Sequence, residues 1–224
     1  RSDGMFEITT SKNEVYCAHY VILCTGVMDV QPIINGSIEP IFEYANAQTM
    51  DYCLICDGHH VLGKNTAVIG HNSGAAWVAI MLHERYEVPI SILTHGEELN
   101  LSDEVQGLVE KYKFKIIKEK ITGLQGKERG ILSQIDFENG QNLKVDICFV
   151  SLGMIVYNEL ARMLGADLDE RGFVKANTAG ETSVANLYVA GDLKANTRKQ
   201  IYTAWDHAVS AANDINQKIR KLRR

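Results

Sequence analysis

Two cysteines separated by two residues are the feature of this 224-residue sequence that most directly suggests chemistry. Cys53 and Cys56 lie in the segment YCLICDG, and Asp57 follows the second cysteine directly. This spacing brings two sulfurs close enough to form a small-ring disulfide, and a helix N-terminus or a nearby cation lowers a thiol pKa towards neutrality. Exchange with a substrate disulfide then passes through a mixed disulfide. Asp57 is well placed to move the protons that this exchange requires.

A zinc site is the main alternative for the same segment, because Cys53, Cys56, His59 and His60 are all potential ligands. These four residues are crowded into eight positions, and no second CxxC or spaced histidine pair follows them. A normal tetrahedral site is hard to build from such a set. We therefore expect a redox role for the cysteines and no bound metal.

Composition and charge narrow the class of protein further. A hydrophobic content of 46% is enough for a sizeable core, and a net charge of −5 argues against a nucleic-acid partner. No apolar run reaches the roughly 20 residues that cross a bilayer, and no signal-peptide pattern opens the sequence. The five cysteines do not resemble a secreted disulfide framework, which favours a reducing, cytoplasmic setting. We expect Cys17, Cys24 and Cys148, which have apolar neighbours, to be buried and inert.

A repeating strand–helix pattern follows the redox motif. Strands are predicted at residues 66–69, 90–93 and 115–117, with helices at residues 75–85 and 104–111 between them. This rhythm is typical of a parallel, doubly wound α/β sheet.

Apolar runs elsewhere predict further strands and a long final helix. The helix would place Ile201, Ala204, Ala208, Ala211, Ile215, Ile219 and Leu222 on one face. The predicted strands are 6–10, a buried run at 15–24 that ends at Thr25-Gly26, 131–137 and 143–152 joined by a turn at 138–141, and 187–190, which ends at Gly191-Asp192.

A turn rich in small residues, Gly70 to Ala75, joins the first strand and helix of the repeating pattern. It occupies the position of a dinucleotide fingerprint, in which glycines let the backbone approach a pyrophosphate at a helix N-terminus. Asn72 replaces the usual middle glycine, although asparagine tolerates left-handed backbone conformations. Nucleotide binding and a plain strand-to-helix turn both remain open for this segment.

Taken in order, these motifs resemble those of the low-molecular-weight thioredoxin reductases. In that family an NAD(P)-type domain that carries the CxxC is inserted into a split FAD domain. The resemblance implies an α/β protein with two Rossmann-like, doubly wound, three-layer domains. Residues 1–33 and 154–224 would belong to the FAD domain and residues 34–153 to the NAD(P)-type domain. No Gly-rich turn for the ADP half of FAD precedes Phe6, so we expect an incomplete FAD domain and a fragment of a longer protein.

The resemblance also implies roles for individual residues. Cys56 would face the flavin and form its charge-transfer contact, Cys53 would attack the substrate disulfide, and Asp57 would be the acid/base. Asp192 would hydrogen-bond the ribityl-phosphate region of the flavin, and Gln200 with Ile201 would line the isoalloxazine. The full set of implied cofactor-binding residues is Gly26, Gly70, Asn72, Gly74, Ala75, His95, Gly191, Asp192, Gln200 and Ile201.

The family's arginine patch for the 2′-phosphate of NADPH is replaced here by THGEELN at residues 94–100. A guanidinium is the natural partner of that phosphate, and Glu97 and Glu98 would repel it. A preference for NADPH is therefore not expected. NADH, a donor such as ferredoxin, and transfer of electrons from the flavin to oxygen all remain open.

We predict an FAD-dependent dithiol/disulfide oxidoreductase in which electrons pass between the flavin and the Cys53/Cys56 pair. The partner would be a thioredoxin-like protein or a small thiol, and the family resemblance implies a homodimer with a rotating domain. The alternative is a non-catalytic module that senses a nucleotide or a thiol. That alternative accounts for the weakened dinucleotide motifs but leaves the CxxC-Asp motif unexplained.

Overall fold

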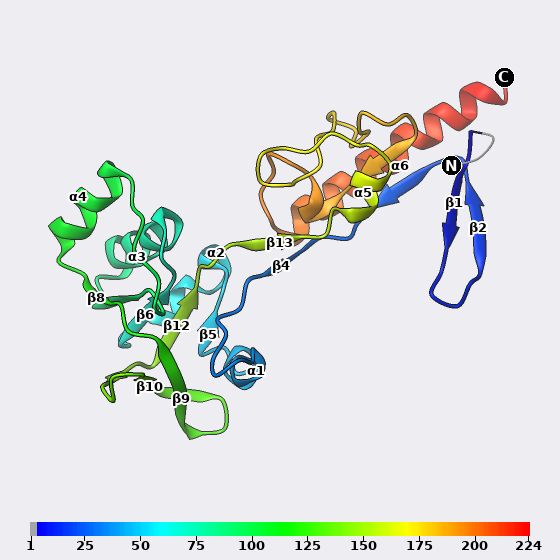
Figure 1. Ribbon diagram of the computed structural model, residues 1–224. Coiled ribbons are helices and arrows are strands. Elements are labelled where there is room, and N and C mark those ends of the chain that lie inside the picture. The colour runs from blue at the N-terminus through cyan, green and yellow to red at the C-terminus, as the bar shows by residue number, and fades with distance from the viewer. Residues whose placement is uncertain (1–3) are drawn as a thin grey trace. The chain divides into compact units, whose positions relative to one another are not determined.

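The computed structural model describes residues 4–224 and divides the chain into two compact units (Figure 1). One unit combines the segment up to Met28 with residues 154–224, and the other comprises residues 29–153. The sequence predicts domain boundaries after residues 33 and 153, and the structure divides the chain after residues 28 and 153. None of the helices in residues 4–224 combines the length and the apolar character needed to span a bilayer.

A five-stranded parallel sheet forms the centre of the unit at residues 29–153. Its order is β5 (Met50–Asp51), β12 (Ile147–Val150), β6 (Thr66–Ile69), β7 (Ile90–Leu93) and β8 (Lys115–Ile117). Helix α3 (Ser73–Tyr86) connects β6 to β7, and α4 (Asp103–Tyr112) connects β7 to β8. The predicted strand–helix rhythm is thus confirmed.

The central strands are apolar at nearly every position because both faces of the sheet are covered. Ile92 packs into the cluster formed with α3 and α4, whereas its neighbour Leu93 packs into the cluster on the opposite face. That opposite face is covered by α1 (Glu39–Asn46) and by a three-stranded antiparallel sheet of β9 (Ile121–Glu128), β10 (Ile131–Phe137) and β11 (Asn142–Lys144). The unit therefore has three layers, as predicted, with a second sheet as one of the outer layers (Figure 1).

The predicted strand at residues 143–152 is two strands in the structure. β11 pairs with β10 in the antiparallel sheet, and β12 pairs with β5 and β6 in the parallel sheet. Between them the carboxylate of Asp146 accepts hydrogen bonds from the backbone and side-chain N–H groups of Asn65, at 2.9 and 3.0 Å. This anchor fixes the point at which the chain passes from one sheet to the other.

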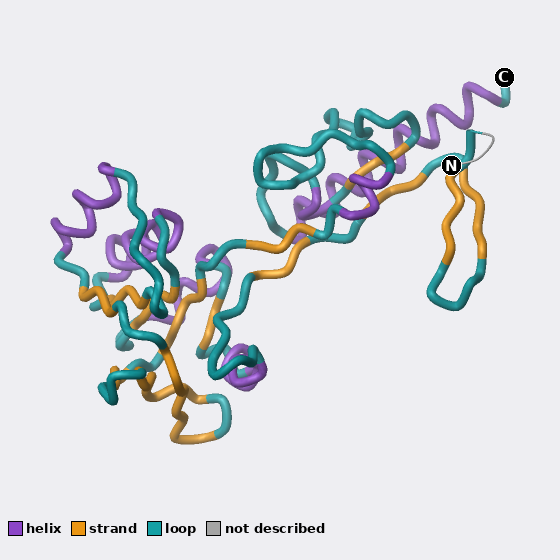
Figure 2. The backbone as a smooth tube through the Cα atoms, viewed as in Figure 1, coloured by secondary structure: helices purple, strands orange, loops and turns teal. Residues whose placement is uncertain are grey.

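The other unit contains little regular structure besides one long helix, and Figure 2 shows mostly loop between α5 and β14. Its elements are the hairpin of β1 (Phe6–Thr9) and β2 (Val15–Ala18), the parallel pair β3 (Val21–Leu23) and β14 (Leu187–Val189), α5 (Glu159–Met163), the 3₁₀ turn η2 (Gly191–Leu193) and α6 (Ile201–Leu222). β4 (Val27–Asp29) and β13 (Met154–Val156) pair with each other where the chain passes between the units.

The prediction of one buried strand at residues 15–24 was wrong, as was the prediction that Cys17 and Cys24 are buried. The run is split between β2 and β3, and both cysteines are exposed. β2 pairs with β1 in a two-stranded hairpin and exposes all of its residues but Ala18, and Cys24 follows the last residue of β3. Cys148, in the central sheet, is buried as predicted, and burial raises the pKa of its thiol.

Helix α6 packs on its unit through only part of the predicted apolar face. Ala211 is buried, Ala204, Ile215 and Ile219 are half-buried, and His207 shares the buried side, while Ile201, Ala208 and Leu222 are exposed. A polar cluster fixes the helix further along: Lys218 Nζ lies 2.7 Å from Glu181 and donates to the hydroxyl of Tyr188, which itself donates to Asp214.

The packing of the central sheet predicts unequal costs for two neighbouring isoleucines. Ile92 is fully buried, whereas Ile116 on the next strand is 38% exposed. Ile92→Ala should lower the free energy of unfolding by about 3 kcal/mol through lost burial and a residual cavity. The matched control Ile116→Ala should cost about 1 kcal/mol or less. Urea unfolding measures both, and equal losses would contradict this description of the core.

Candidate active site

The two cysteines of the CxxC motif form a disulfide immediately after the edge strand β5. The Cα atoms of Cys53 and Cys56 are 5.3 Å apart. Cys53 caps the short helix α2 (Leu54–Asp57), and its Sγ accepts a hydrogen bond from the Cys56 N–H at 3.1 Å. Cys56 is exposed and Cys53 is half-buried. The predicted pair is therefore assembled as a disulfide that a partner can reach.

Asp57 lies beside this disulfide, as its position in the motif predicts. Its N–H donates to the Cys53 carbonyl at 2.9 Å and closes the turn of α2. A carboxylate oxygen of Asp57 and the sulfurs of Cys53 and Cys56 all lie within 4.8 Å of one another. That separation allows the carboxyl group to exchange protons with either sulfur directly or through one water molecule.

His60 does not join the cysteines in the four-residue set considered for zinc. Its Nδ1 lies 2.9 Å from the Oδ2 of Asp51, the last residue of β5. Asp51 is only 5% exposed, and burial raises the pKa of its carboxyl group, an effect that the hydrogen bond from His60 partly offsets. The carboxylates of Asp51 and Asp57 and the His60 ring form a second close group, with ligand atoms within 4.8 Å of one another.

The turn after β6 is held by contacts within the chain itself. A side chain at Gly70 would collide with Ala75 and with the carbonyl of Ser151, so only glycine fits this close approach. The Oδ1 of Asn72 accepts a hydrogen bond from the Ala75 N–H at 3.1 Å and so caps α3. A Cβ at Gly74 would lie 3.1 Å from the same Oδ1.

The loop after β7 is hydrogen-bonded along this turn. The Asn100 N–H donates to the His71 carbonyl at 2.8 Å, and the Ser102 N–H donates to the Ser73 hydroxyl at 2.9 Å. The fingerprint residues Gly70, Asn72, Gly74 and Ala75 are thus brought together as predicted, but in a turn braced by its own side chains.

His95 has a structural role that its sequence position did not suggest. Its backbone has a positive φ of 54°, its Nδ1 accepts from the Ile121 N–H, and its Nε2 donates to the Ile33 carbonyl, both at 3.0 Å. Burial lowers the pKa of His95, so the ring is neutral near pH 7. It therefore supplies no positive charge for a phosphate, and the exposed Glu97 and Glu98 nearby carry the opposite charge.

In the described part of the chain, two buried side-chain nitrogens lack a hydrogen-bond partner, His71 Nδ1 and His207 Nδ1. His71 lies within the turn after β6. The His207 ring hydrogen-bonds the backbone of Gly191, where the sequence predicts flavin contacts. An unsatisfied buried nitrogen is the kind of group that a bound ligand or an ordered water completes.

The segment around Gly191 carries the remaining predicted flavin contacts. Gly191 has a φ of +71°, and a Cβ there would lie 3.6 Å from Ala204 on α6. Asp192 lies close enough to Lys199 for their charges to interact. Gln200 is the residue at the N-cap position of α6, and Ile201, the first residue of the helix, is 71% exposed.

These residues fit a flavin chemically. Tyr202 and Trp205 are exposed with Ile201 on the first turns of α6, an apolar surface that a planar ring could cover. In the same unit the carbonyl of Gly26, the last predicted contact, accepts from the Tyr157 N–H at 3.1 Å.

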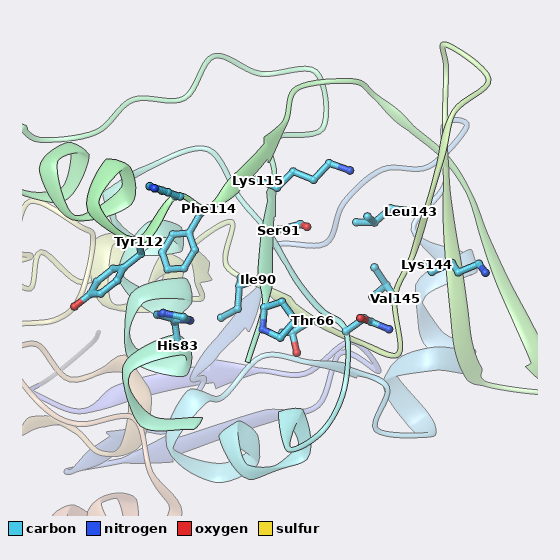
Figure 3. Close-up of a pocket in the computed structure, with 13 residues that line it drawn as sticks. Thr66, His83, Ile90, Ser91, Tyr112, Phe114, Lys115, Leu143, Lys144 and Val145 are labelled. Atoms are coloured by element: carbon cyan, nitrogen blue, oxygen red, sulfur yellow. The ribbon is translucent and has the colours of Figure 1, made fainter. Parts of the chain in front are cut away.

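A separate cavity of about 360 Å³ opens at the other end of the parallel sheet (Figure 3). It is lined by residues at the amino ends of the strands, Thr66, Ile90 and Lys115 among them, and the rings of His83, Tyr112 and Phe114 gather on one side of it. Ligands of open α/β sheets bind at the carboxyl ends of the strands. The CxxC and the turn at Gly70 follow those carboxyl ends, so the cavity is separate from the site.

A disulfide-forming CxxC on the carboxyl edge of a three-layer α/β unit defines a disulfide oxidoreductase. The family model described as pyridine nucleotide-disulphide oxidoreductase matches residues 2–212, and the chain belongs to this family. Membership agrees with the predicted fold and with the predicted activity, a flavin-dependent disulfide oxidoreductase that uses FAD.

Individual relatives support this assignment. The thioredoxin reductase of Bacillus subtilis is 25% identical over 97% of this chain and 68% of its own length. The thioredoxin reductase of Mycoplasma genitalium is 28% identical over 79% of this chain and 58% of its own length. The crystal structure of a Bacillus anthracis protein assigned as thioredoxin reductase TrxB superposes with a TM-score of 0.84 at 26% identity, covering 100% of this chain and 72% of that one.

Sequence reasoning missed the contact between Asp51 and His60. The available signal was an acidic residue two positions before Cys53, together with a histidine three positions after Asp57. A charged residue in such a position is almost always paired when it is buried.

The two contacts of His95 predict a pH-dependent contribution to stability. Because the folded-state pKa is lowered, the unfolded chain binds more protons as the pH falls. The contribution is therefore complete above the ordinary histidine pKa of about 6.5 and is lost as the pH falls through and below it. His95→Asn tolerates the left-handed backbone but cannot make both contacts.

We expect His95→Asn to lower the free energy of unfolding by about 1–2 kcal/mol at pH 7.5, as expected for a buried N–H left without its partner. The difference from the wild type should shrink at about pH 5.5. Denaturant unfolding at the two pH values measures it. A difference that is independent of pH would contradict the assignment of a neutral, structural His95.

Proposed function

We propose that this protein passes electrons between FAD and a thioredoxin-like protein or a small thiol through Cys53 and Cys56. The observation that supports the proposal most directly is the Cys53–Cys56 disulfide with Asp57 beside it, in a turn that is partly exposed. The names of the relatives identify thioredoxin reductases, which favours a protein disulfide as the partner.

FAD, when bound, would supply or accept the two electrons of the reaction. Gly191, Asp192, Gln200 and Ile201 would hold its flavin end, with the exposed apolar start of α6 as the surface beneath the ring. The chain's own contribution is then thiol chemistry. The Cys53 thiolate attacks one sulfur of the substrate disulfide, and Asp57 delivers a proton to the sulfur that leaves. Cys56 attacks Cys53 in turn, restores the internal disulfide and releases the second substrate thiol.

We assign the attacking role to Cys53 on the family resemblance, although Cys56 is the more exposed residue of the two. The two thiols have different tasks in this scheme, since Cys56 resolves the mixed disulfide and contacts the flavin. The assignment therefore predicts different behaviour for the two single-cysteine variants.

This proposal assigns no preference for NADPH as the electron donor, and NAD(P)H remains a possible donor. Glu97 and Glu98 are exposed in the loop after β7, and His95 is neutral and occupied by two backbone groups. The loop itself contains no lysine or arginine for a 2′-phosphate, and the neighbouring Lys118 is paired with Glu98 at 3.2 Å. NADH and a non-nicotinamide donor such as ferredoxin both fit this surface better.

We further infer a homodimer in a reducing, cytoplasmic compartment. The exposed Cys17 and Cys24 are free thiols, and the internal disulfide is the redox pair and not a structural staple. Free, exposed thiols persist where glutathione and thioredoxin keep them reduced.

Single-cysteine variants test the proposed function. The reduced Cys56→Ser variant should form a stable mixed disulfide with a bacterial thioredoxin whose resolving cysteine is replaced by serine and whose remaining cysteine is activated as its disulfide with an aromatic thiol, because no active-site thiol remains in either protein to resolve it. The reduced Cys53→Ser variant should form little. Mass spectrometry of the products without added reductant, in parallel with oxidised glutathione as a small disulfide, measures both.

The outcomes of this experiment separate the possibilities. Trapping of thioredoxin by Cys56→Ser supports a protein substrate, and trapping of glutathione alone supports a small thiol. Trapping only by Cys53→Ser would reverse the two assigned roles. No trapping by either variant would contradict a thiol-exchange function.

A further inference from the structure

The disulfide and the buried Asp51–His60 pair share one residue. Asp57 lies within 4.8 Å of both cysteine sulfurs, and its carboxylate lies within the same distance of the Asp51 carboxylate and of a His60 ring nitrogen. His60 belongs to the 3₁₀ turn η1 (Gly58–Val61), which follows α2 without a break. A continuous set of proton-carrying groups therefore leads from the redox sulfurs to the interior of the unit.

The innermost group of this set is the carboxyl group of Asp51, which is paired with His60. Asp51 is 5% exposed, and the Nδ1 of His60 is held 2.9 Å from its Oδ2. A buried carboxylate is costly unless it is paired, so Asp51 fixes both the ring orientation and the protonated nitrogen of His60.

Several groups set the electrostatics around Asp51. Burial raises the pKa of the Asp51 carboxyl group, the charge of Asp57 acts in the same direction, and Lys64 acts against them. From neighbouring positions, Tyr52 and the thiol of Cys148 also face this group. A ring nitrogen of His60 lies within 4.8 Å of the carboxylates of both Asp51 and Asp57, so an imidazole, which can donate or accept a proton, is within reach of both.

We propose that His60, oriented by the buried Asp51, is a positioning residue that restores the proton of Asp57 during thiol–disulfide exchange. The inference rests on the proposed function of the Cys53/Cys56 pair. It adds a role to two residues outside the CxxC-Asp motif.

The role of His60 follows from the protons that are transferred during one reaction cycle. As Cys53 attacks, its bond to a substrate sulfur forms, the substrate S–S bond breaks, and the leaving thiolate takes a proton from Asp57. Asp57 then takes a proton from His60, and His60 is reprotonated from the Cys56 thiol as Cys56 becomes the resolving thiolate, or from solvent. Cys56 then attacks Cys53, the bond between Cys53 and the substrate sulfur breaks, and the second leaving thiolate takes the restored proton from Asp57. The protein dithiol is thereby oxidised to a disulfide, and its two protons and two electrons reduce the substrate disulfide to two thiols.

Two disulfide probes distinguish this role from simple support of the fold. Glutathione disulfide releases a basic alkyl thiolate that needs a proton, whereas 5,5′-dithiobis(2-nitrobenzoate) releases an aromatic thiolate that is stable without one. The whole chain carries Cys17→Ser and Cys24→Ser in every variant, because these exposed free thiols would also react with the probes. It is reduced with dithiothreitol, freed of it under argon and mixed with each probe from about pH 5.5 to 9, a range that spans the charge change of histidine.

The test variant is His60→Gln, whose amide N–H can still donate to Asp51 but cannot titrate. His59→Gln, which changes the exposed neighbouring histidine, is the matched control. We expect His60→Gln to react about tenfold more slowly with glutathione disulfide at pH 7, a part of the hundredfold or more that direct acid–base catalysis contributes. Its rate with the aromatic probe should match that of the control.

A double-mutant cycle tests whether His60 acts through Asp57. In an Asp57→Asn background, His60→Gln should have no further effect on the rate with glutathione disulfide. Asp51→Asn, which removes the carboxylate that orients His60, should slow the reaction with glutathione disulfide as His60→Gln does. Circular dichroism shows whether each variant is folded.

Three results would overturn the inference. His60→Gln could slow both probes equally across the pH range, match His59→Gln with glutathione disulfide, or keep its full effect in the Asp57→Asn background. Because no flavin takes part in these reactions, an intact protein that binds no flavin would refute the proposed function and leave this inference standing.

Discussion

The pairing of the two-residue strand β5 with β12 is the constraint on which the candidate site depends. Met50 and Asp51 lie in parallel register with Cys148 and Phe149, and the Cys148 N–H donates to the Thr49 carbonyl at 3.0 Å. This pairing buries Met50 and Asp51 at the edge of the sheet and releases the chain into the CxxC turn. The position of the disulfide and the burial of Asp51 thus have one structural origin.

The same edge of the sheet carries the second functional segment. Strand β6 ends at Gly70, where the close approach of Ala75 and Ser151 admits no side chain. The side chain of Asn72 then completes the first turn of α3 in place of an external group. Together with the two backbone contacts of the neutral His95, this cap holds the loops at the carboxyl edge of the sheet through contacts within the chain.

Much of the fold follows from local pattern in the sequence. The strand–helix rhythm from residue 66 to residue 117 was predicted because β6 and β7 are short apolar runs buried in the sheet, separated by segments long enough for one helix each. β5 was not predicted, since two residues carry no periodic signal, and the apolar run at 143–152 was divided by the Asp146–Asn65 contact, which joins positions distant in sequence. The exposure of Cys17 and Cys24 depends on how many layers cover a strand, which a local apolar pattern does not encode. Likewise, the CxxC-Asp motif was evident from spacing alone, whereas the Asp51–His60 pair required the tertiary fold.

The most direct test of the central claim is an anaerobic absorbance spectrum of the intact protein encoded by its gene, recorded during titration with dithiothreitol. The account predicts a flavin spectrum that the dithiol bleaches in the wild type and that stays largely oxidised in the Cys53→Ser/Cys56→Ser double variant over the same time. Equal bleaching in the two proteins, or the absence of a flavin spectrum, would contradict electron transfer between FAD and this cysteine pair.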